Sequence, residues 1–461
     1  MTIQAFKEFI KEKAKDFNAK SVKIVSHLDS DGISSAALLI KMCKLKDIEQ
    51  SLSIVPQLDE NKLIELSKEP HSFFIFSDIG SGQISLINHL MKNKQVLILD
   101  HHLPEKIQPN QNITHINPHE FGIDGSLDIS GSGVVYLFCR EINEGIKDFA
   151  YIPIIGAIGD VQEVNGFSSL NQEILQDALN SKKVRTQKGI KIFGLQTRPL
   201  YKLLEYSSDI HIPGVSGSRT GAMQFLQSIG IDPKKGTKWR FFNDLTGDEI
   251  DNLIKNLILK RKNESNPEDI IGSRYILINE KYDSPFHDLK EFSTILNGCG
   301  RLQRPELGIG ALLNEDKAKH HALLALAEYK KEIVQFMNWF REQRGKEIIE
   351  EHNYIIINGK NKVPATMIGT MSSIISKSKL VKEGIFVLGL SRQENKTKIS
   401  LRVSSKNNAI DLRIILKQIT KEIGGEAGGH KFAAGAIIET DKEQEFIKKA
   451  KEILLLQEQS F

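Results

Sequence analysis

Short apolar runs alternate with amphipathic segments through the first third of the chain. Four runs have the composition of buried strands, SVKIVSH, LSIV, FFIFSD and QVLILD, and the segments ISSAALLIKMCKL, ENKLIELSK and ISLINHLMK between them have the spacing of helices. Strands this apolar are covered on both faces, and strands separated by helices pair in parallel. The pattern predicts a doubly wound α/β domain with a mainly parallel sheet over residues 1–180.

The pattern changes over residues 181–285, which we expect to form an inserted α-rich module. This region opens with the stretch Lys182–Lys202, which carries seven basic residues and no acidic one. With Phe193 and Tyr201 between the cations, the stretch fits a track for a nucleic-acid backbone, a docking surface for a protein partner or a solvated face.

A connecting helix and a second, smaller α/β domain are predicted after the insertion. Residues 286–350 complete the first domain, and residues 316–351 keep helical periodicity with one Gly and no Pro, which corresponds to roughly 50 Å of helix. The strand patterns YIIING, GIFVLGL and KISLRVSS, with the helix pattern AIDLRIILKQITKEI, predict the smaller domain over residues 351–461.

Composition narrows the class of protein without indicating an activity. Lys and Arg total 62 against 58 Asp and Glu, so the net charge of +4 does not by itself point to a nucleic-acid partner. The three cysteines, Cys43, Cys139 and Cys299, form no C-x-x-C pair, and a thiolate zinc site is not supported. The N-terminal segment has the pattern of an amphipathic helix and no run approaches the ~18 apolar residues of a membrane span, so we expect a cytoplasmic protein with no membrane partner.

Ionisable side chains stand where four apolar runs end. They are His27, Asp29 and Asp31 in HLDSDG, Asp78 in SDIGSG, Asp100, His101 and His102 in DHH, and Asp160 in GDVQE. Ligand crevices of open α/β sheets lie outside the carboxyl ends of the strands, so these side chains are expected at one edge of the sheet. Each alone is compatible with a helix cap or a turn. Together, five carboxylates and two or three imidazoles repel one another strongly without bound cations, and the set predicts a metal site.

The ligand types narrow the choice of metal. Carboxylates and imidazoles without thiolates favour Mn²⁺ or Mg²⁺ ahead of zinc. The side chains suffice for two ions that share one carboxylate, about 3.5–4 Å apart, an arrangement that supports displacement at phosphorus. The residues themselves therefore predict hydrolysis of a phosphate ester.

The motifs HLDSDG, SDIGSG, DHH and GDVQE, in this order and spacing, resemble motifs one to four of the DHH phosphoesterase superfamily. The segment GGEAGGHKFAAG resembles the substrate-binding motif of its DHHA1 partner domain, with Ala427 in place of one glycine. Within the superfamily the whole chain is similar to archaeal RecJ-like single-strand exonucleases, including the GINS-associated nuclease. Those relatives carry an insertion between the DHH motifs and the DHHA1 domain.

The resemblance implies two Mn²⁺ ions, with Mg²⁺ as an alternative. The implied ligands are His27, Asp29 and Asp78 for the first ion and Asp31, Asp78, His101 and Asp160 for the second, with Asp78 bridging. The resemblance also implies that Asp100 orients a ligating histidine and that His102 faces the scissile phosphate.

In the second domain the resemblance implies a phosphate-binding set. Gly428, Gly429 and His430 are expected to contact the substrate backbone, with Arg402 beside them. Arg301, in NGCGRLQRPELGIG, matches a segment of the archaeal relatives that could line the substrate path, and a structural loop is the alternative.

The resulting hypothesis is a metal-dependent, single-strand-specific exonuclease of DNA or RNA, acting in DNA replication or repair, with GINS or a replicative helicase complex as an implied partner. Two alternatives stay open: a phosphodiesterase of dinucleotides and very short RNA, and a replisome scaffold descended from the nuclease. The basic insertion argues against the first because a dinucleotide needs no extended track. The complete ligand set argues against the second. The sequence decides neither DNA against RNA nor the polarity.

Overall fold

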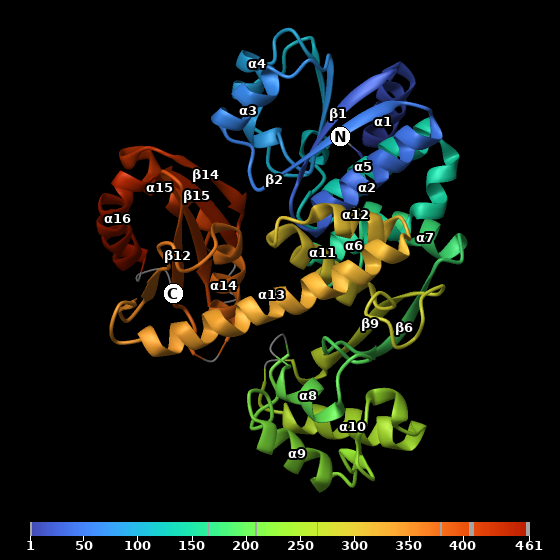
Figure 1. The fold of residues 1–461 in the computed structure, drawn as a ribbon, viewed down its shortest axis with the longest axis vertical. Coiled ribbons are helices and arrows are strands. Elements are labelled where there is room, and N and C mark those ends of the chain that lie inside the picture. The colour runs from blue at the N-terminus through green and yellow to red at the C-terminus, as the bar shows by residue number, and fades with distance from the viewer. Residues whose placement is uncertain are drawn as a thin grey trace.

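A parallel-sheet domain, a small helical insertion and a second sheet domain follow one another along the chain in the computed structural model (Figure 1). The structure describes residues 2–164, 166–207, 210–264, 266–378, 380–404 and 410–457. Of His430 it describes the backbone alone. None of the helices in these ranges is both long and apolar enough to cross a membrane.

Five parallel strands form the centre of the N-terminal domain, in the order β2-β1-β3-β4-β5. The strands are β1 (Ser21–His27), β2 (Glu49–Val55), β3 (Phe73–Ser77), β4 (Gln95–Leu99) and β5 (Ile113–Ile116). The edge strand β5 was not predicted, because its four residues are too short a run to stand out from the flanking polar segments.

Alternate residues of these strands enter two different cores. Ile24, Ile75 and Leu97 pack under helices on one face, whereas Val25 and Phe76 pack under helices on the other. The first face is covered by α2 (Ser30–Leu45) and α5 (Gly131–Ile142), and α1 (Ile3–Asp16), α6 (Tyr151–Gly159) and α7 (Ser169–Asn180) pack on these two helices or on each other. The second face is covered by α3 (Glu60–Ser67) and α4 (Ile84–Leu90). The prediction of a doubly wound α/β domain is confirmed.

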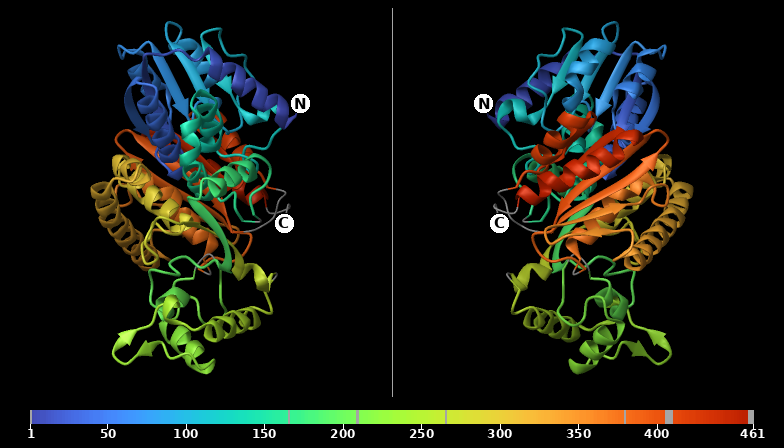
Figure 2. Two further views of the ribbon diagram at one scale, coloured as in Figure 1. Left: turned by 90° about the vertical axis from the view of Figure 1, so that its right-hand side faces the viewer. Right: turned by 90° about the vertical axis from the view of Figure 1, so that its left-hand side faces the viewer.

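An antiparallel two-stranded ribbon connects the insertion to the N-terminal domain, and the insertion has a hydrophobic core of its own. The ribbon pairs β6 (Val184–Ile190) with β9 (Ile271–Leu277). Between them lie α8 (Leu200–Glu205), α9 (Arg219–Ser228), the short strands β7 (Lys234–Lys235) and β8 (Lys238–Trp239), and α10 (Gly247–Lys260). Two views from opposite sides, each turned by 90° from the view of Figure 1, show the insertion projecting away from both sheet domains (Figure 2).

Three helices join the insertion to the C-terminal domain. They are α11 (Leu289–Arg301), α12 (Pro305–Leu312) and α13 (Asp316–Gln343), and α13 runs beneath both sheet domains (Figure 1). The predicted helix over 316–351 is wrong at its C-terminal end. Gly345 adopts a φ of +73°, a left-handed conformation that ends helices, and Ile349–Glu350 pairs as strand β10. The 28 residues of α13 span about 42 Å.

The C-terminal domain is a six-stranded mixed sheet in the order β10-β11-β12-β13-β15-β14. Its remaining strands are β11 (Tyr354–Asn358), β12 (Phe386–Gln393), β13 (Lys396–Val403), β14 (Glu426–His430) and β15 (Ala433–Glu439). Helix α14 (Ala365–Lys377) covers one face, and α15 (Leu412–Ile423) and α16 (Glu443–Leu456) cover the other. The predicted smaller α/β domain, joined by a long helix, is confirmed.

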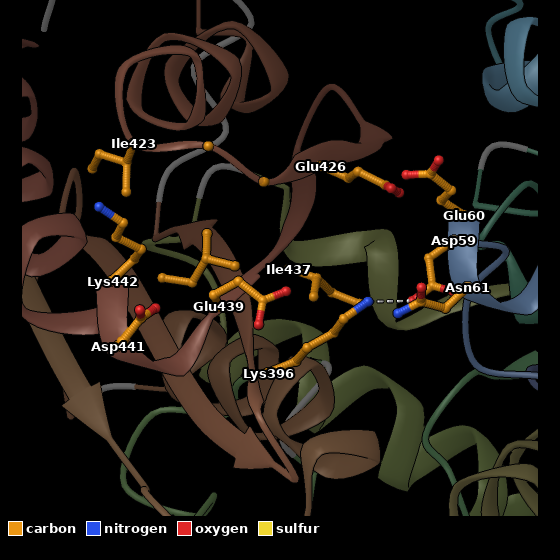
Figure 3. A pocket seen from close by; sticks show the side chains of 13 residues that line it. Asp59, Glu60, Asn61, Lys396, Ile423, Glu426, Ile437, Glu439, Asp441 and Lys442 are labelled. Atoms are coloured by element: carbon orange, nitrogen blue, oxygen red, sulfur yellow. Dashed lines mark hydrogen bonds and ion pairs between the residues drawn. The ribbon is translucent and has the colours of Figure 1, made fainter.

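A cavity of about 330 Å³ lies where the two sheet domains meet (Figure 3). Asp59 and Glu60, at the start of α3, line its N-terminal side, and Lys396, Glu426 and Glu439 line it from the C-terminal sheet. Carboxylates from both domains therefore face one another across this gap, with the ammonium group of Lys396 between them.

Candidate metal centre

Three neighbouring strands of the N-terminal sheet end at the same place. β3 lies between β1 and β4, and the backbone N–H of Asp78 donates to the carbonyl oxygen of Leu99 at 3.0 Å. His27 is the last residue of β1, and Asp78 and Asp100 directly follow β3 and β4. The parallel arrangement brings these three side chains to the carboxyl edge of the sheet.

Two further carboxylates come from the N-terminus of α2. Asp29 caps the helix and accepts a hydrogen bond from the backbone N–H of Gly32 at 3.1 Å, and Asp31 lies in the first turn with no exposed surface. The backbone N–H groups at a helix N-terminus favour negative charge, so this turn can hold two carboxylates close together.

A first group of ligand atoms forms around His27. Its Nδ1 lies 2.8 Å from Oδ2 of Asp29 and 3.6 Å from Oδ2 of Asp78. One ligand atom from each of these three side chains falls within 4.8 Å of the others. The group combines one imidazole nitrogen with two carboxylate oxygens.

A second group forms around the buried His101. Its Nε2 lies 3.3 Å from Oδ2 of Asp160, 3.3 Å from Oδ1 of Asp78 and 3.9 Å from Oδ2 of Asp31. On the opposite side of the ring, Nδ1 lies 2.6 Å from the carbonyl oxygen of Gly125, which can only accept, so Nδ1 carries a proton. Burial alone would lower the pKa of His101, yet Asp78, Asp160 and Asp31 outweigh it and raise the pKa, so that without a cation Nε2 is protonated as well. A bound cation would replace that proton and receive the lone pair of Nε2. Asp78 contacts both groups through different oxygens.

Asp160 comes from a helix end and not from a strand end. It is the C-cap of α6, and the following residue, Val161, has a φ of +63° although it is β-branched. Backbone strain of this kind persists only where surrounding contacts enforce it. Gln162 provides one such contact, because its buried side-chain amide donates to the carbonyl oxygen of Gly125 at 3.0 Å.

The carboxylate of Asp31 lies against the N-terminus of α5, in a space that is open because two of the surrounding residues are glycines. Ser132 donates to its Oδ1 from the backbone N–H, at 3.1 Å, and from the hydroxyl. A Cβ at Gly156 would stand 2.2 Å from the same oxygen, and a Cβ at Gly131 would stand 2.9 Å from Oδ2. Two glycines and one serine therefore shape the space for a single carboxylate.

Asp100 holds the turn that carries the two histidines. It accepts hydrogen bonds from the backbone N–H groups of His101 (2.8 Å), His102 (3.2 Å) and Ser81 (2.9 Å), and Nδ1 of His102 lies 2.8 Å away. Burial opposes ionisation of Asp100, but His102 and these donors outweigh it and lower the pKa of the carboxyl. Asp100 is therefore ionised, and its hydrogen bonds hold the backbone of both histidines in place.

Protons balance the negative charge of the two groups. Burial, followed by repulsion from Asp78, raises the pKa of Asp31 to about 7. Burial also raises the pKa of Asp160, with Asp31 adding to the effect. Burial alone would lower the pKa of His27, yet Asp29 and Asp78 outweigh it and raise the pKa to about 10. Bound cations would take over this role and release protons.

Two orphaned oxygens test whether a metal fits. Oδ2 of Asp31 and Oδ1 of Asp78 are buried, and among the described residues neither accepts a hydrogen bond. A buried carboxylate oxygen without a donor is costly unless a cation compensates it. With oxygen and imidazole nitrogen ligands and no thiolate, the set fits Mn²⁺ or Mg²⁺.

Family models match three parts of the chain: the DHH family N-terminal domain at residues 21–156, the DHH-CID domain at 192–273 and the DHHA1 domain at 352–455. An uncharacterised protein of Methanocaldococcus jannaschii, MJ0831, is 32% identical over 441 residues, which cover 94% of this chain and 93% of that protein. The chain belongs to the DHH/DHHA1 superfamily.

Solved structures add that the fold is RecJ-like. Cdc45 from Entamoeba histolytica matches with a TM-score of 0.65 at 13% identity, over 98% of this chain and 99% of that one. RecJ with Mn²⁺ from Thermus thermophilus matches with a TM-score of 0.57 at 16% identity, over 99% of this chain but 55% of that one. A manganese-bound exonuclease RecJ matches with a TM-score of 0.55 at 14% identity, over 99% and 95%. At these identities the likeness is one of fold.

Three cations lie close together near the metal centre: Arg301 at the end of α11, and Lys398 and Arg402 on β13 of the DHHA1 domain. Arg301 and Thr366 bond to each other's carbonyl oxygens, at 3.1 and 2.8 Å, and Arg402 donates to the carbonyl oxygen of Ala434 at 3.1 Å. Lys398 was missed by sequence reasoning, although the period-two alternation of KISLR places it on the same face of β13 as Arg402.

The charges of this set reach the metal centre. Burial lowers the pKa of Lys398 to about 8, with Arg301 and Arg402 contributing and Asp29 opposing. Burial also lowers the pKa of Arg402 to about 10, with Arg301 next in importance. Cations crowded in this way repel one another, and a bound polyanion would offset that repulsion.

The glycine motif lies on the edge strand β14, paired with β15 through Gly428 with Gly435 and Gly429 with Ala434. Gly429 has a φ of +113°, and a Cβ there would stand 2.5 Å from the carbonyl oxygen of Ala433. An edge strand presents backbone N–H groups to a ligand on its open side. The predicted contact by the side chain of His430 lies outside what the structure describes.

The basic stretch of the insertion does not offer both of its aromatic rings for stacking. Tyr201 is only 5% exposed, and its ring packs on Trp239 with centroids 4.3 Å apart. The guanidinium of Arg198 lies 5.0 Å from the centre of the Phe193 ring. The two rings thus contribute to local packing.

Proposed function

We propose that this protein hydrolyses phosphodiester bonds of single-stranded DNA or RNA, stepwise from one end, with two divalent cations. The observation that carries the proposal is the pairing of two ligand groups, joined by Asp78, with Arg301 of α11 and with Lys398 and Arg402 of the facing domain. The division of labour follows the predicted domains: residues 1–180 and 286–350 for catalysis, 181–285 as an inserted module and 351–461 for substrate binding.

The residues fit two ions. His27, Asp29 and Asp78 would hold one, and Asp31, Asp78, His101 and Asp160 would hold the other. Mn²⁺ is the first candidate and Mg²⁺ the second, and when bound they would supply an acidified water and stabilise the charge that develops on the phosphoryl oxygens.

The chain's own residues bind and orient the substrate. Arg301, Lys398 and Arg402 would hold phosphates by charge-assisted hydrogen bonds, and the N–H groups around Gly428 and Gly429 would add neutral ones. Asp100 fixes Nδ1 of His102 and would thereby orient the ring toward the scissile phosphate. No covalent intermediate is needed, and the reaction is hydrolysis.

The test uses 5′- and 3′-labelled single-stranded DNA and RNA of about 20 nucleotides, long enough for several phosphate contacts. Wild type is assayed with Mn²⁺, Mg²⁺ or EDTA, beside Asp78→Asn. Asparagine tolerates the φ of +59° at this position, so the variant removes charge without adding backbone strain. Stepwise mononucleotide release, lost with EDTA and in the variant, is expected. Intact strands despite bound Mn²⁺ would contradict the proposal.

The insertion supports a second role, docking to a replication complex such as one containing GINS. The observation that favours it is the likeness to Cdc45 over 98% of this chain, insertion included. Deletion of residues 191–270, with the ribbon closed by a short turn, is expected to abolish binding to purified GINS while hydrolysis of short strands persists. Unchanged binding by the deletion variant would remove this role.

A further inference from the structure

Three side chains beneath the DHH turn form a hydrogen-bonded series of the type Ser–His–Glu. Oγ of Ser81 lies 2.9 Å from Nε2 of His115, and Nδ1 of His115 lies 2.8 Å from Oε1 of Glu120. Ser81 begins a short 3₁₀ turn after β3, His115 lies in β5 and Glu120 follows that strand. Ser81 is fully buried and His115 is 5% exposed.

A fourth side chain connects this series to the catalytic turn. The amide Nδ2 of the buried Asn117 donates to Oγ of Ser81 and to the carbonyl oxygen of His102, each at 2.8 Å. The backbone N–H of Ser81 in turn donates to Oδ2 of Asp100 at 2.9 Å. The series therefore reaches both ends of the Asp100–His102 turn.

The chemistry of the groups fixes the direction of each hydrogen bond. An amide nitrogen only donates, so Oγ of Ser81 accepts from Asn117. The carboxylate of Glu120 accepts, so Nδ1 of His115 carries the proton and Nε2 of the neutral ring is an acceptor. Ser81 then donates its hydroxyl hydrogen to Nε2. Each donor in the series faces an acceptor, so a single pattern of hydrogen bonds satisfies all four side chains.

The same order of groups activates serine nucleophiles in hydrolases, and that role does not fit here. A nucleophile must reach its substrate, whereas Ser81 has no exposed surface and its Oγ is engaged with both Asn117 and His115. The contacts of the series lead instead to Asp100 and to the carbonyl group of His102.

We propose that Glu120, His115, Ser81 and Asn117 form a positioning network for the DHH turn, which holds Asp100 and thereby orients the ring of His102 toward the scissile phosphate. The inference rests on the proposed function. Its members are positioning residues, because none contacts the ligand atoms of the two metal groups. Networks that support a site in this way commonly change activity about 10–100-fold when broken.

Glu120→Ala is the cleanest test because 40% of the Glu120 side chain is exposed, so its removal leaves no buried cavity. Glu120→Gln is the conservative partner, since its side-chain oxygen can still accept from His115. His115→Phe and Ser81→Ala break the series at its centre, alone and together. Glu144→Ala and His320→Phe, at exposed positions, are the matched controls.

Three measurements separate positioning from other roles. The first is kcat and KM for Mn²⁺-dependent hydrolysis of a labelled single strand. The second is the affinity for Mn²⁺, by calorimetry. The third is the ¹⁵N spectrum of the metal-free protein labelled at histidine, in which His102→Gln assigns the His102 ring. The third needs no activity, so it tests the network even if wild type proves not to be a nuclease.

We expect Glu120→Ala and His115→Phe to lower kcat about 10–100-fold with KM and Mn²⁺ affinity within about two-fold, and to shift the His102 ring signals in the metal-free protein. Glu120→Gln should restore most of kcat, and Ser81→Ala with His115→Phe should cost no more than either change alone. Unshifted His102 signals would overturn the proposal, as would an equal loss of Mn²⁺ affinity or a phosphoserine trapped at Ser81.

Discussion

The ammonium nitrogen of Lys396 lies 2.8 Å from Oδ2 of Asp59, across the gap between the two sheet domains. The side chains are 31% and 20% exposed, so the pair is neither fully solvated nor buried. Beside it, burial and then the Asp59 carboxylate raise the pKa of Glu426. One attractive contact thus offsets repulsion between carboxylates at the meeting point of the domains.

Removing the charge of Asp59 is expected to loosen this meeting point without unfolding either domain. Asp59→Asn keeps an acceptor for the backbone N–H of Lys62, which Asp59 caps at 2.9 Å, and deletes the attraction to Lys396. The stability change should stay below about 1 kcal/mol, as for other partly exposed pairs. Distances between spin labels on the two domains should broaden. A distribution identical to that of wild type would show that the pair does not hold the domains.

Gly156→Ala should damage the metal centre although alanine is the better helix former. The new Cβ would stand 2.2 Å from Oδ1 of Asp31 and 2.2 Å from Oγ of Ser132, so the carboxylate must move. We expect the affinity for Mn²⁺, measured by calorimetry, to fall about 10-fold or more. Gly247→Ala, in α10, is the control because its Cβ meets no atom within 4 Å. Equal Mn²⁺ affinities in both variants would contradict the claim that Gly156 makes room for the Asp31 carboxylate.

Lys398→Gln should weaken binding of single strands independently of their sequence. Each cation that neutralises a phosphate contributes about 0.7 to the slope of log affinity against log salt for a single strand, so the slope should fall by that amount. Fluorescence anisotropy in the Asp78→Asn background measures it without cleavage. Lys448→Gln, exposed on α16, is the matched control. If Lys398→Gln and the control have the same slope of log affinity against log salt, Lys398 does not contact the bound nucleic acid.

Glu291 should make the protein less stable as the pH rises. Burial, followed by Asp288, raises its pKa from 4.5 to about 7, against the opposing effects of Thr197 and the nearby Lys330 and Arg198. The folded state therefore binds a proton that the unfolded state has lost between pH 4.5 and 7, and stability falls through that window.

Glu291→Gln removes this dependence and can still accept the hydrogen bond from Thr197, which is 2.9 Å long in the wild type. Urea unfolding should show equal stabilities at pH 4.5 and a variant more stable by on the order of 1–3 kcal/mol at pH 8. A constant difference between the two proteins at every pH would contradict the assigned pKa shift.

Much of the fold could be predicted because its strands are buried on both faces. Continuous apolar runs mark β1, β3 and β4, and the polar residue after each run marks the edge where a site can form. The resemblance to the DHH superfamily added the ligand assignments, which stay predictions until metal binding is measured. The end of α13 was missed because Ile348–Glu351 continues the helical spacing and only the conformation of Gly345 interrupts it.

The rest of the site depends on contacts that no local pattern contains. Ser132 reaches Asp31 across 101 positions, and His115 reaches Ser81 across 34. A serine after a strand and a histidine within one are ordinary residues on their own. Their importance comes from the order of the strands, which places β5 beside β4 and so brings His115 beneath the DHH turn.

The ribbon of β6 and β9 pairs Val184 with Leu277 at its base and Ile190 with Ile271 at its tip, so the insertion leaves and rejoins the chain at a single point. Insertions are best tolerated at surface sites of this kind, where the two ends of the segment lie side by side. Mutation and recombination can therefore enlarge, exchange or erase this segment while both sheets keep their geometry. In evolutionary terms, the ribbon lets one DHH/DHHA1 framework acquire new partners while the residues of its candidate site stay unchanged.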